Sequence, residues 1–189
     1  MSHYQAGETF QKIDYTARPL PVGEYEGCRF FNCNFENVDL GSIKFIECEF
    51  VGCNLSLAKL GNTAFGDVIF KDCKMMGLHF EQCNSFNFTV RFENCILDHA
   101  SFYQVKMKNA LFSGSKLSEV DFTETLLTGS NFDRCDLRGA KFEHTNLEKA
   151  DFRTAYNYSI DPELNTLKKA KFSQLGIHGL LDKYNIEIS

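Results

Sequence analysis

Cysteine and histidine are the residues in this chain whose side chains most readily bind metals or react. The chain has eight cysteines and five histidines among 189 residues. Cys28 and Cys33 lie five residues apart, and the same spacing recurs at Cys48 and Cys53. Thiols in this number can form a metal site, a disulfide framework or a redox device. No two cysteines have the short spacer of a zinc site and no histidine lies at ligand spacing, so the sequence predicts no metal.

A hydrophobic residue recurs every five positions along most of the chain. Phe, Leu or Met occupies every fifth position from Phe30 to Phe80, and again from Phe92 to Phe152. The Phe residues at these repeat centres include Phe30, Phe35, Phe45, Phe50, Phe65, Phe70, Phe92, Phe102, Phe112, Phe122, Phe132, Phe142 and Phe152. The position two before each centre is mostly small or β-branched. It holds Cys28, Cys33, Cys48, Cys53, Cys73, Cys95 and Cys135, with Cys83 at the same position before a degenerate centre at Ser85.

A period of five fits neither an α-helix, with about 3.6 residues per turn, nor a strand with its period of two. It fits a chain that turns a corner every five residues, so that four faces close a coil of about twenty residues and coils stack about 4.8 Å apart. The centre and the small residue would both point into a narrow interior. We therefore predict an all-β fold, a quadrilateral β-helix with a short C-terminal helical cap. The alternation of Phe with Leu or Met after Phe92 predicts stacked Phe columns on two opposite faces.

On such a fold the cysteines become small buried wall residues, a common role of free cysteine. Cys33, Cys53 and Cys73 lie twenty residues apart and should form one column, where neighbours could approach disulfide distance. The chain starts without the basic and apolar regions of a signal peptide, which predicts a cytoplasmic protein with reduced thiols. We predict no cofactor. We also predict no enzyme, because the sequence offers no triad, no carboxylate pair and no glycine-rich phosphate loop.

Two stretches match a known repeat closely: "CDLRGAKFEHTNLEKADFR" (135–153) and "CNFENVDLGS" (33–42). Their pattern resembles the pentapeptide-repeat family. The resemblance implies a right-handed quadrilateral β-helix. The layout is similar to that of the Qnr-type quinolone-resistance branch, whose members have a small C-terminal helix that pairs two rods. That branch implies DNA gyrase or topoisomerase IV as the partner, recognised through a shape and charge like those of duplex DNA. The two surface loops of many Qnr-type proteins are not evident here.

The chain divides into three predicted parts. Residues 1–27 form an N-terminal cap and partial first coil, 28–152 form the β-helix, and 153–189 form a final coil, a helix and a possible dimerisation segment. The register breaks near 81–91, as either a structural bulge or a binding loop. The Asp161-Pro162 pair predicts a short helix over 161–169.

The C-terminal stretch 175–188 predicts a short helix that covers the end of the rod. Leu175, Leu180, Leu181 and Tyr184 lie near one face of that helix. A helix this short does not stand alone in water, so it must pack on the rod. The same residues either serve this packing alone or also form the contact of a homodimer.

Charge restricts the class of partner. The chain has 20 Lys plus Arg against 25 Asp plus Glu, which argues against direct binding of nucleic acid. No apolar run approaches the about 20 residues of a membrane span. Glu119, Asp121, Glu124 and Glu143 form either an ordinary solvated face or a negative, DNA-like surface for a protein partner, and Lys116 and Lys141 nearby dilute the charge. The hypothesis is a non-enzymatic interaction protein that binds gyrase or topoisomerase IV and confers quinolone tolerance. The alternative is a structural or regulatory scaffold for another protein.

Overall fold

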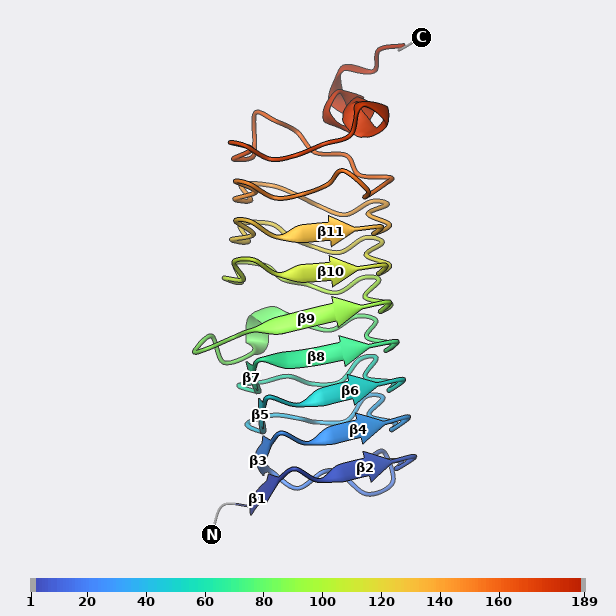
Figure 1. The fold of residues 1–189 in the computed structure, drawn as a ribbon, viewed down its shortest axis with the longest axis vertical. Helices are drawn as coiled ribbons and strands as arrows, with labels where there is room; N and C mark the ends of the chain where they lie inside the picture. The colour runs from blue at the N-terminus through green and yellow to red at the C-terminus, as the bar shows by residue number, and fades with distance from the viewer. Residues whose placement is uncertain (1–2, 188–189) are drawn as a thin grey trace.

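The computed structural model describes residues 3–187 and shows a parallel β-solenoid, in which the chain climbs as a stack of four-sided coils (Figure 1). Residues about twenty apart pair across neighbouring coils, as Phe30 pairs with Phe50 and Phe45 with Phe65. The solenoid predicted from the spacing of five is thereby confirmed. None of the helices within residues 3–187 is long and apolar enough to span a bilayer.

Two of the four faces carry regular strands. The β3 face holds a 4-stranded sheet in the order β1 (His3–Ala6), β3 (Gly23–Glu26), β5 (Lys44–Ile46) and β7 (Ala64–Gly66). The β4 face holds a 7-stranded sheet in the order β11 (Asn131–Asp133), β10 (Leu111–Ser113), β9 (Val90–Glu93), β8 (Val68–Lys71), β6 (Glu49–Val51), β4 (Arg29–Phe31) and β2 (Thr9–Gln11). Single bridges link the coils on the other two faces. The Lys116 face has the bridges Ile96–Lys116–Asp136, and the Asp121 face has Ser101–Asp121–Lys141.

Most corners of the coils depend on a residue in the left-handed backbone region. This residue follows the centre by two positions, as at Asn32, Asn37, Ser42 and Glu47, with φ between 51° and 62°. The conformation turns the chain and aims its N–H along the rod; Asn32 N–H, for example, donates to Val51 O at 2.8 Å. Asn and Gly adopt this region with the least strain, whereas other residues pay about 1 kcal/mol or more. The corners therefore restrict which residue types can occupy a position that faces water.

The interior is a pair of stacked aromatic columns that meet edge to face. On the β4 face Phe112 stacks on Phe132 at 5.1 Å between ring centroids and 4° between ring planes. On the opposite Asp121 face Phe122 stacks on Phe142 at 5.2 Å. Phe112 meets Phe122 across the interior at 5.9 Å and 82°. This arrangement confirms the two opposite Phe columns predicted from the alternation of Phe with Leu, and aromatic pairs of both kinds are favourable.

The register break moves one aromatic column from one face to the next. Before the break the second column is Tyr25, Phe45 and Phe65 on the β3 face, and after it the column is Phe80, Phe102, Phe122 and Phe142 on the Asp121 face. Phe88 packs against both columns, since its ring centroid lies 6.4 Å from that of Phe65 and 6.2 Å from that of Phe80. The helix η1 (Phe80–Gln82) precedes the break. Figure 1 shows the segment between η1 and β9 as a loop that leaves the stack.

The helix predicted over 161–169 is wrong. Asp161 accepts the N–H of Glu163 at 2.9 Å in a turn, and Thr166 and Lys171 then bridge back to the coil below. Leu167 and Phe172 continue the spacing of five and pack on the core, so tertiary burial outweighs the local helix signal. The rod ends in two short 3₁₀ helices, η2 (Gln174–Leu180) and η3 (Asp182–Tyr184).

Replacing Gly129 with Ala is expected to lower the free energy of unfolding by about 1–2 kcal/mol. Gly129 is a corner residue with φ of 72°, and a Cβ there would lie 2.4 Å from Asn109 Oδ1. Gly61 is the matched control, because its φ is not in the left-handed region and a Cβ there would meet no atom within 4 Å. Chemical denaturation of both variants tests this; equal stabilities would contradict the role of the corner.

Candidate functional site

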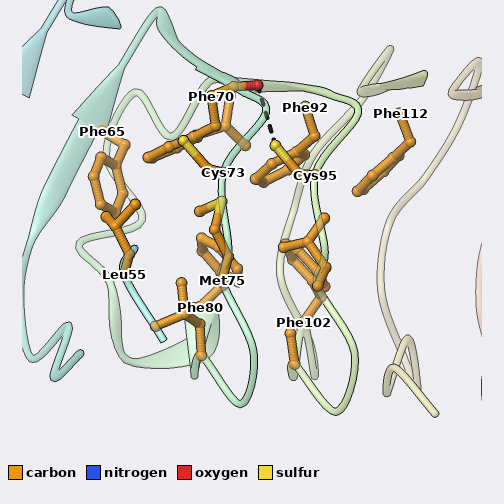
Figure 2. Close-up of a cluster of buried hydrophobic side chains, with 14 of the residues drawn as sticks. Leu55, Phe65, Phe70, Cys73, Met75, Phe80, Phe92, Cys95, Phe102 and Phe112 are labelled. Carbon is orange, nitrogen blue, oxygen red and sulfur yellow. Dashed lines mark hydrogen bonds between the residues drawn. The ribbon is translucent and has the colours of Figure 1, made fainter. Parts of the chain in front are cut away.

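The cysteines form part of the wall of the rod. Seven of the eight are buried, and Cys83 at the register break is half-buried. Each buried thiol donates a hydrogen bond to a backbone oxygen of the coil below. Cys95, for example, donates to Phe70 O at 3.3 Å (Figure 2). Cys53 does the same to Phe30 O at 3.2 Å and also accepts the N–H of Cys33 at 3.4 Å. These thiols therefore link coils, a role that the prediction of small buried wall residues did not include.

Two of the buried thiols, Cys48 and Cys135, are poorly reactive. Burial raises the pKa of Cys48 and of Cys135 to about 12, so both thiols are neutral at ordinary pH and poor nucleophiles. Because a buried thiol resists ionisation, it stabilises the fold fully below about pH 8.5, and this contribution is lost as the pH rises toward 12. Within residues 3–187 no group of three or more His, Cys, Asp or Glu side chains could hold a metal ion.

The four acidic residues of the predicted partner surface lie close together on the rod. Asp121 is on the Asp121 face, Glu119 precedes it at the corner, and Glu124 follows it at the next corner. Glu124 N–H donates to the backbone oxygen of Glu143 at 2.8 Å, which places Glu143 one coil further along. Three of the carboxylates are exposed, and Asp121 is half-buried.

Some of this negative charge is engaged by neighbouring side chains. The His99 ring nitrogen Nδ1 lies 3.3 Å from Glu119 Oε2, and Gln104 Nε2 donates to Glu124 Oε2 at 2.8 Å. Basic residues also lie nearby, since Lys141 bridges to Asp121 and the backbone oxygen of Arg138 accepts the Glu119 N–H at 2.8 Å.

The acidic surface continues beyond the residues found from the sequence. Asp161 and Glu163 lie on the next coil, where His144 N–H donates to Leu164 O at 3.1 Å. Lys183 from η3 pairs with both, at 2.8 Å from Asp161 Oδ1 and 2.7 Å from Glu163 Oε2. Its ammonium group holds the pKa of both carboxyls below their usual range. The continued spacing at Leu167 and Phe172 was the signal for this coil, and the predicted helix obscured it.

The C-terminal residues predicted to lie on one helical face have different surroundings. Leu175 and Tyr184 are exposed, at 90% and 52% of their surface, while Leu180 and Leu181 are half-buried and Leu180 packs on the core. The chain turns as 3₁₀ helix here, so these residues do not share one α-helical stripe. Ile177 and Ile186, which the sequence analysis did not single out, are also exposed.

The helix η2 lies directly against the last coil. Ile160 N–H donates to Gly179 O at 2.9 Å, and a Cβ on Gly179 would lie only 2.2 Å from Tyr158 O. Glycine is needed there for the close approach. The cap therefore closes the apolar end of the rod, and Leu175 remains free on its outer side.

Comparison with known proteins identifies the repeat. The family model described as "Pentapeptide repeat region" matches residues 24–89 and 85–157, more than half of the 189-residue chain. The chain belongs to the pentapeptide-repeat family. No match was found among curated protein sequences.

One solved structure shares the fold, and others are similar to this chain over most of their length. Trypsin-treated QnrB1, a plasmid-mediated fluoroquinolone resistance protein, is similar over 100% of both chains, with a TM-score of 0.57 and 18% identity. Full-length QnrB1 matches over 97% of this chain and 100% of its own, with a TM-score of 0.44 and 18% identity. HetL, a pentapeptide-repeat protein involved in heterocyst differentiation regulation in the cyanobacterium Nostoc sp. strain PCC 7120, covers 90% of this chain and 84% of its own, with a TM-score of 0.38 and 14% identity.

In this pentapeptide-repeat protein, replacing Cys53 with Ala is expected to cost about 1–3 kcal/mol of stability, because two buried backbone groups lose their partner. Replacing it with Ser should cost less. Ser130 already makes both bonds, accepting Ala110 N–H at 3.2 Å and donating to Met107 O at 3.4 Å. Denaturant unfolding of the two variants measures the difference. The same pair of changes at half-buried Cys83 is the control, and a Cys53→Ser variant no more stable than Cys53→Ala would contradict the bonding role.

In the native protein a thiol reagent at pH 8 is expected to modify Cys83 slowly, because partial burial raises the pKa of its thiol, and to spare the seven buried cysteines. All eight should react after unfolding in denaturant. Counting the released chromophore measures this, and Cys83→Ser should abolish the native signal. Rapid reaction of several thiols in the folded chain would show that the wall is not closed.

Proposed function

We propose that this protein is a non-enzymatic binding protein whose acidic surface around Asp121 docks on the DNA-binding surface of DNA gyrase or topoisomerase IV, and thereby confers tolerance to quinolones. The single observation that carries the proposal is the exposed acidic group of Glu119, Asp121, Glu124 and Glu143 on a rigid rod. The interior is consistent with the non-enzymatic part of the proposal, since stacked Phe side chains fill it. The fold it shares with QnrB1 makes gyrase the first partner to test.

Charge density supports a local likeness to DNA. A coil advances the rod by about 4.8 Å, and duplex DNA carries about three phosphates over that distance. Glu119, Asp121 and Glu124 supply three carboxylates from a single coil. Further along, Lys141 and Lys183 offset part of the acidic charge. The DNA-like density is therefore concentrated at one level of the rod, which is where we expect the contact with the enzyme.

The test is a gyrase supercoiling assay with the purified protein, with and without a fluoroquinolone. Wild-type protein is expected to alter supercoiling and to raise the drug concentration needed for inhibition. Removing two carboxylates with Glu119→Gln and Glu124→Gln should weaken the effect at least tenfold, because most of the local charge is lost.

The control removes the same amount of charge from the same type of corner elsewhere. Glu47 and Asp67 are exposed residues with φ of 52° and 54°, as Glu119 and Glu124 are exposed with φ of 56°. The Glu47→Gln, Asp67→Asn variant should keep full activity. If wild-type protein neither binds gyrase or topoisomerase IV nor changes their response to the drug, the proposal fails.

A further inference from the structure

The register break leaves one rung missing from the hydrogen-bond ladder on the β3 face. Elsewhere on this face, the backbone N–H of the residue before the centre donates to the backbone oxygen of the small inward residue in the coil below. The series contains Ala64 to Ile43 at 2.9 Å, Asn84 to Thr63 at 2.9 Å, Leu126 to Val105 at 3.0 Å and Asn146 to Thr125 at 3.0 Å. Within residues 3–187 no bond joins Lys106 N–H to Cys83 O, which is the corresponding pair. The sheet of this face also ends at β7, just below the gap.

A hollow lies at the missing rung. It has a volume of about 660 Å³, and its lining includes Phe80, Cys83, Phe88, Val105 and Lys106. Cys83 and Val105 occupy inward positions but are only half-buried. The equivalent residues of other coils, Thr63, Thr125 and Thr145, are exposed by 0–1%. The wall of the rod is therefore open at this level, and apolar side chains that belong to the core can be reached from outside.

Side-chain hydrogen bonds hold the start of the loop beside the hollow. Asn84 Nδ2 donates to Asn62 Oδ1 at 3.0 Å, and Asn84 Oδ1 accepts the N–H of Phe86 at 2.9 Å. These bonds fix the start of the loop, and Phe86 beyond them exposes 80% of its surface. The loop therefore begins in a fixed conformation at the edge of the hollow, which Ser85 and Phe88 help to line.

Charges of opposite sign flank the opening. Glu81 lines the hollow on the side of the Asp121 face. Lys106 lines it on the β3 face, and Lys108 follows on the same coil. Both lysines are exposed, and neither has an ion pair within residues 3–187.

We propose that this opening, the break slot (Phe80, Cys83, Phe88, Val105 and Lys106), binds an extended peptide segment of a protein partner. A free N–H and a free C=O at the edge of a ladder are the groups that an added strand satisfies. The hollow between Phe80, Phe88 and Val105 takes one aliphatic side chain of that segment. A basic residue on one side of it faces Glu81, and an acidic residue on the other faces Lys106 and Lys108. The inference rests on the proposed role as a binding protein but not on gyrase as the partner.

The test uses the full chain and fluorescent, end-blocked heptapeptides with a central Val between Lys and Glu, in both orders. Fluorescence anisotropy should show binding of one order, and a central Gly or an N-methylated central Val should weaken it at least tenfold. Val105→Met fills the hollow and should weaken binding by a similar factor. Val22→Met is the matched control, because Val22 is 62% exposed at a distant site.

Amide hydrogen exchange gives a second readout that does not depend on a variant folding correctly. The Lys106 amide should exchange faster than the Leu126 amide in the free protein, and the bound peptide should slow it. Equal protection of both amides in the free protein would overturn the proposal, as would the absence of peptide binding or equal binding by the Val105→Met and Val22→Met variants. Peptide binding without any effect on gyrase would reject the proposed partner and leave the slot standing.

Discussion

The hydrogen bonds that run along the rod are the interaction on which the rest of the structure depends. Each coil is too short to fold alone, and its backbone groups are satisfied by the coils above and below, as when Phe35 N–H donates to Asn54 O at 2.6 Å. This ladder fixes the spacing of twenty residues between stacked positions. It therefore stacks side chains that are twenty residues apart directly on one another. The continuous column from Phe92 through Phe112 and Phe132 to Phe152 is the result.

The same ladder explains the choice of small inward residues. A side chain at these positions must be small enough for the narrow interior, and it also lies beside backbone groups of the coil below. Cys53, Thr125 and Ser130 each donate to a backbone oxygen of the preceding coil. Alanine and valine meet the requirement of size alone. The preference for Cys, Ser and Thr at many of these positions thus reflects hydrogen bonding together with packing.

A solid rod places all recognition on its surface. Stacked side chains fill the interior, so a partner meets either the charges of the faces or a level at which the stack is interrupted. The acidic group around Asp121 is the first kind of feature, and the break between Phe80 and Val90 is the second. They lie at neighbouring levels, since Ser101 bridges both His79 and Asp121. A single partner that spans a few coils can therefore contact both.

The sequence by itself determined the solenoid, the inward residues and the two Phe columns, because a period of five leaves only one regular way to stack the coils. Tertiary structure decided the rest. The coil that contains Leu167 and Phe172 forms where local signals predict a helix, since burial on the core stabilises it more than local preference does. The gap between Lys106 and Cys83 depends on which coils lie next to one another. Contacts between residues twenty or more positions apart become definite only once the register of every coil is fixed.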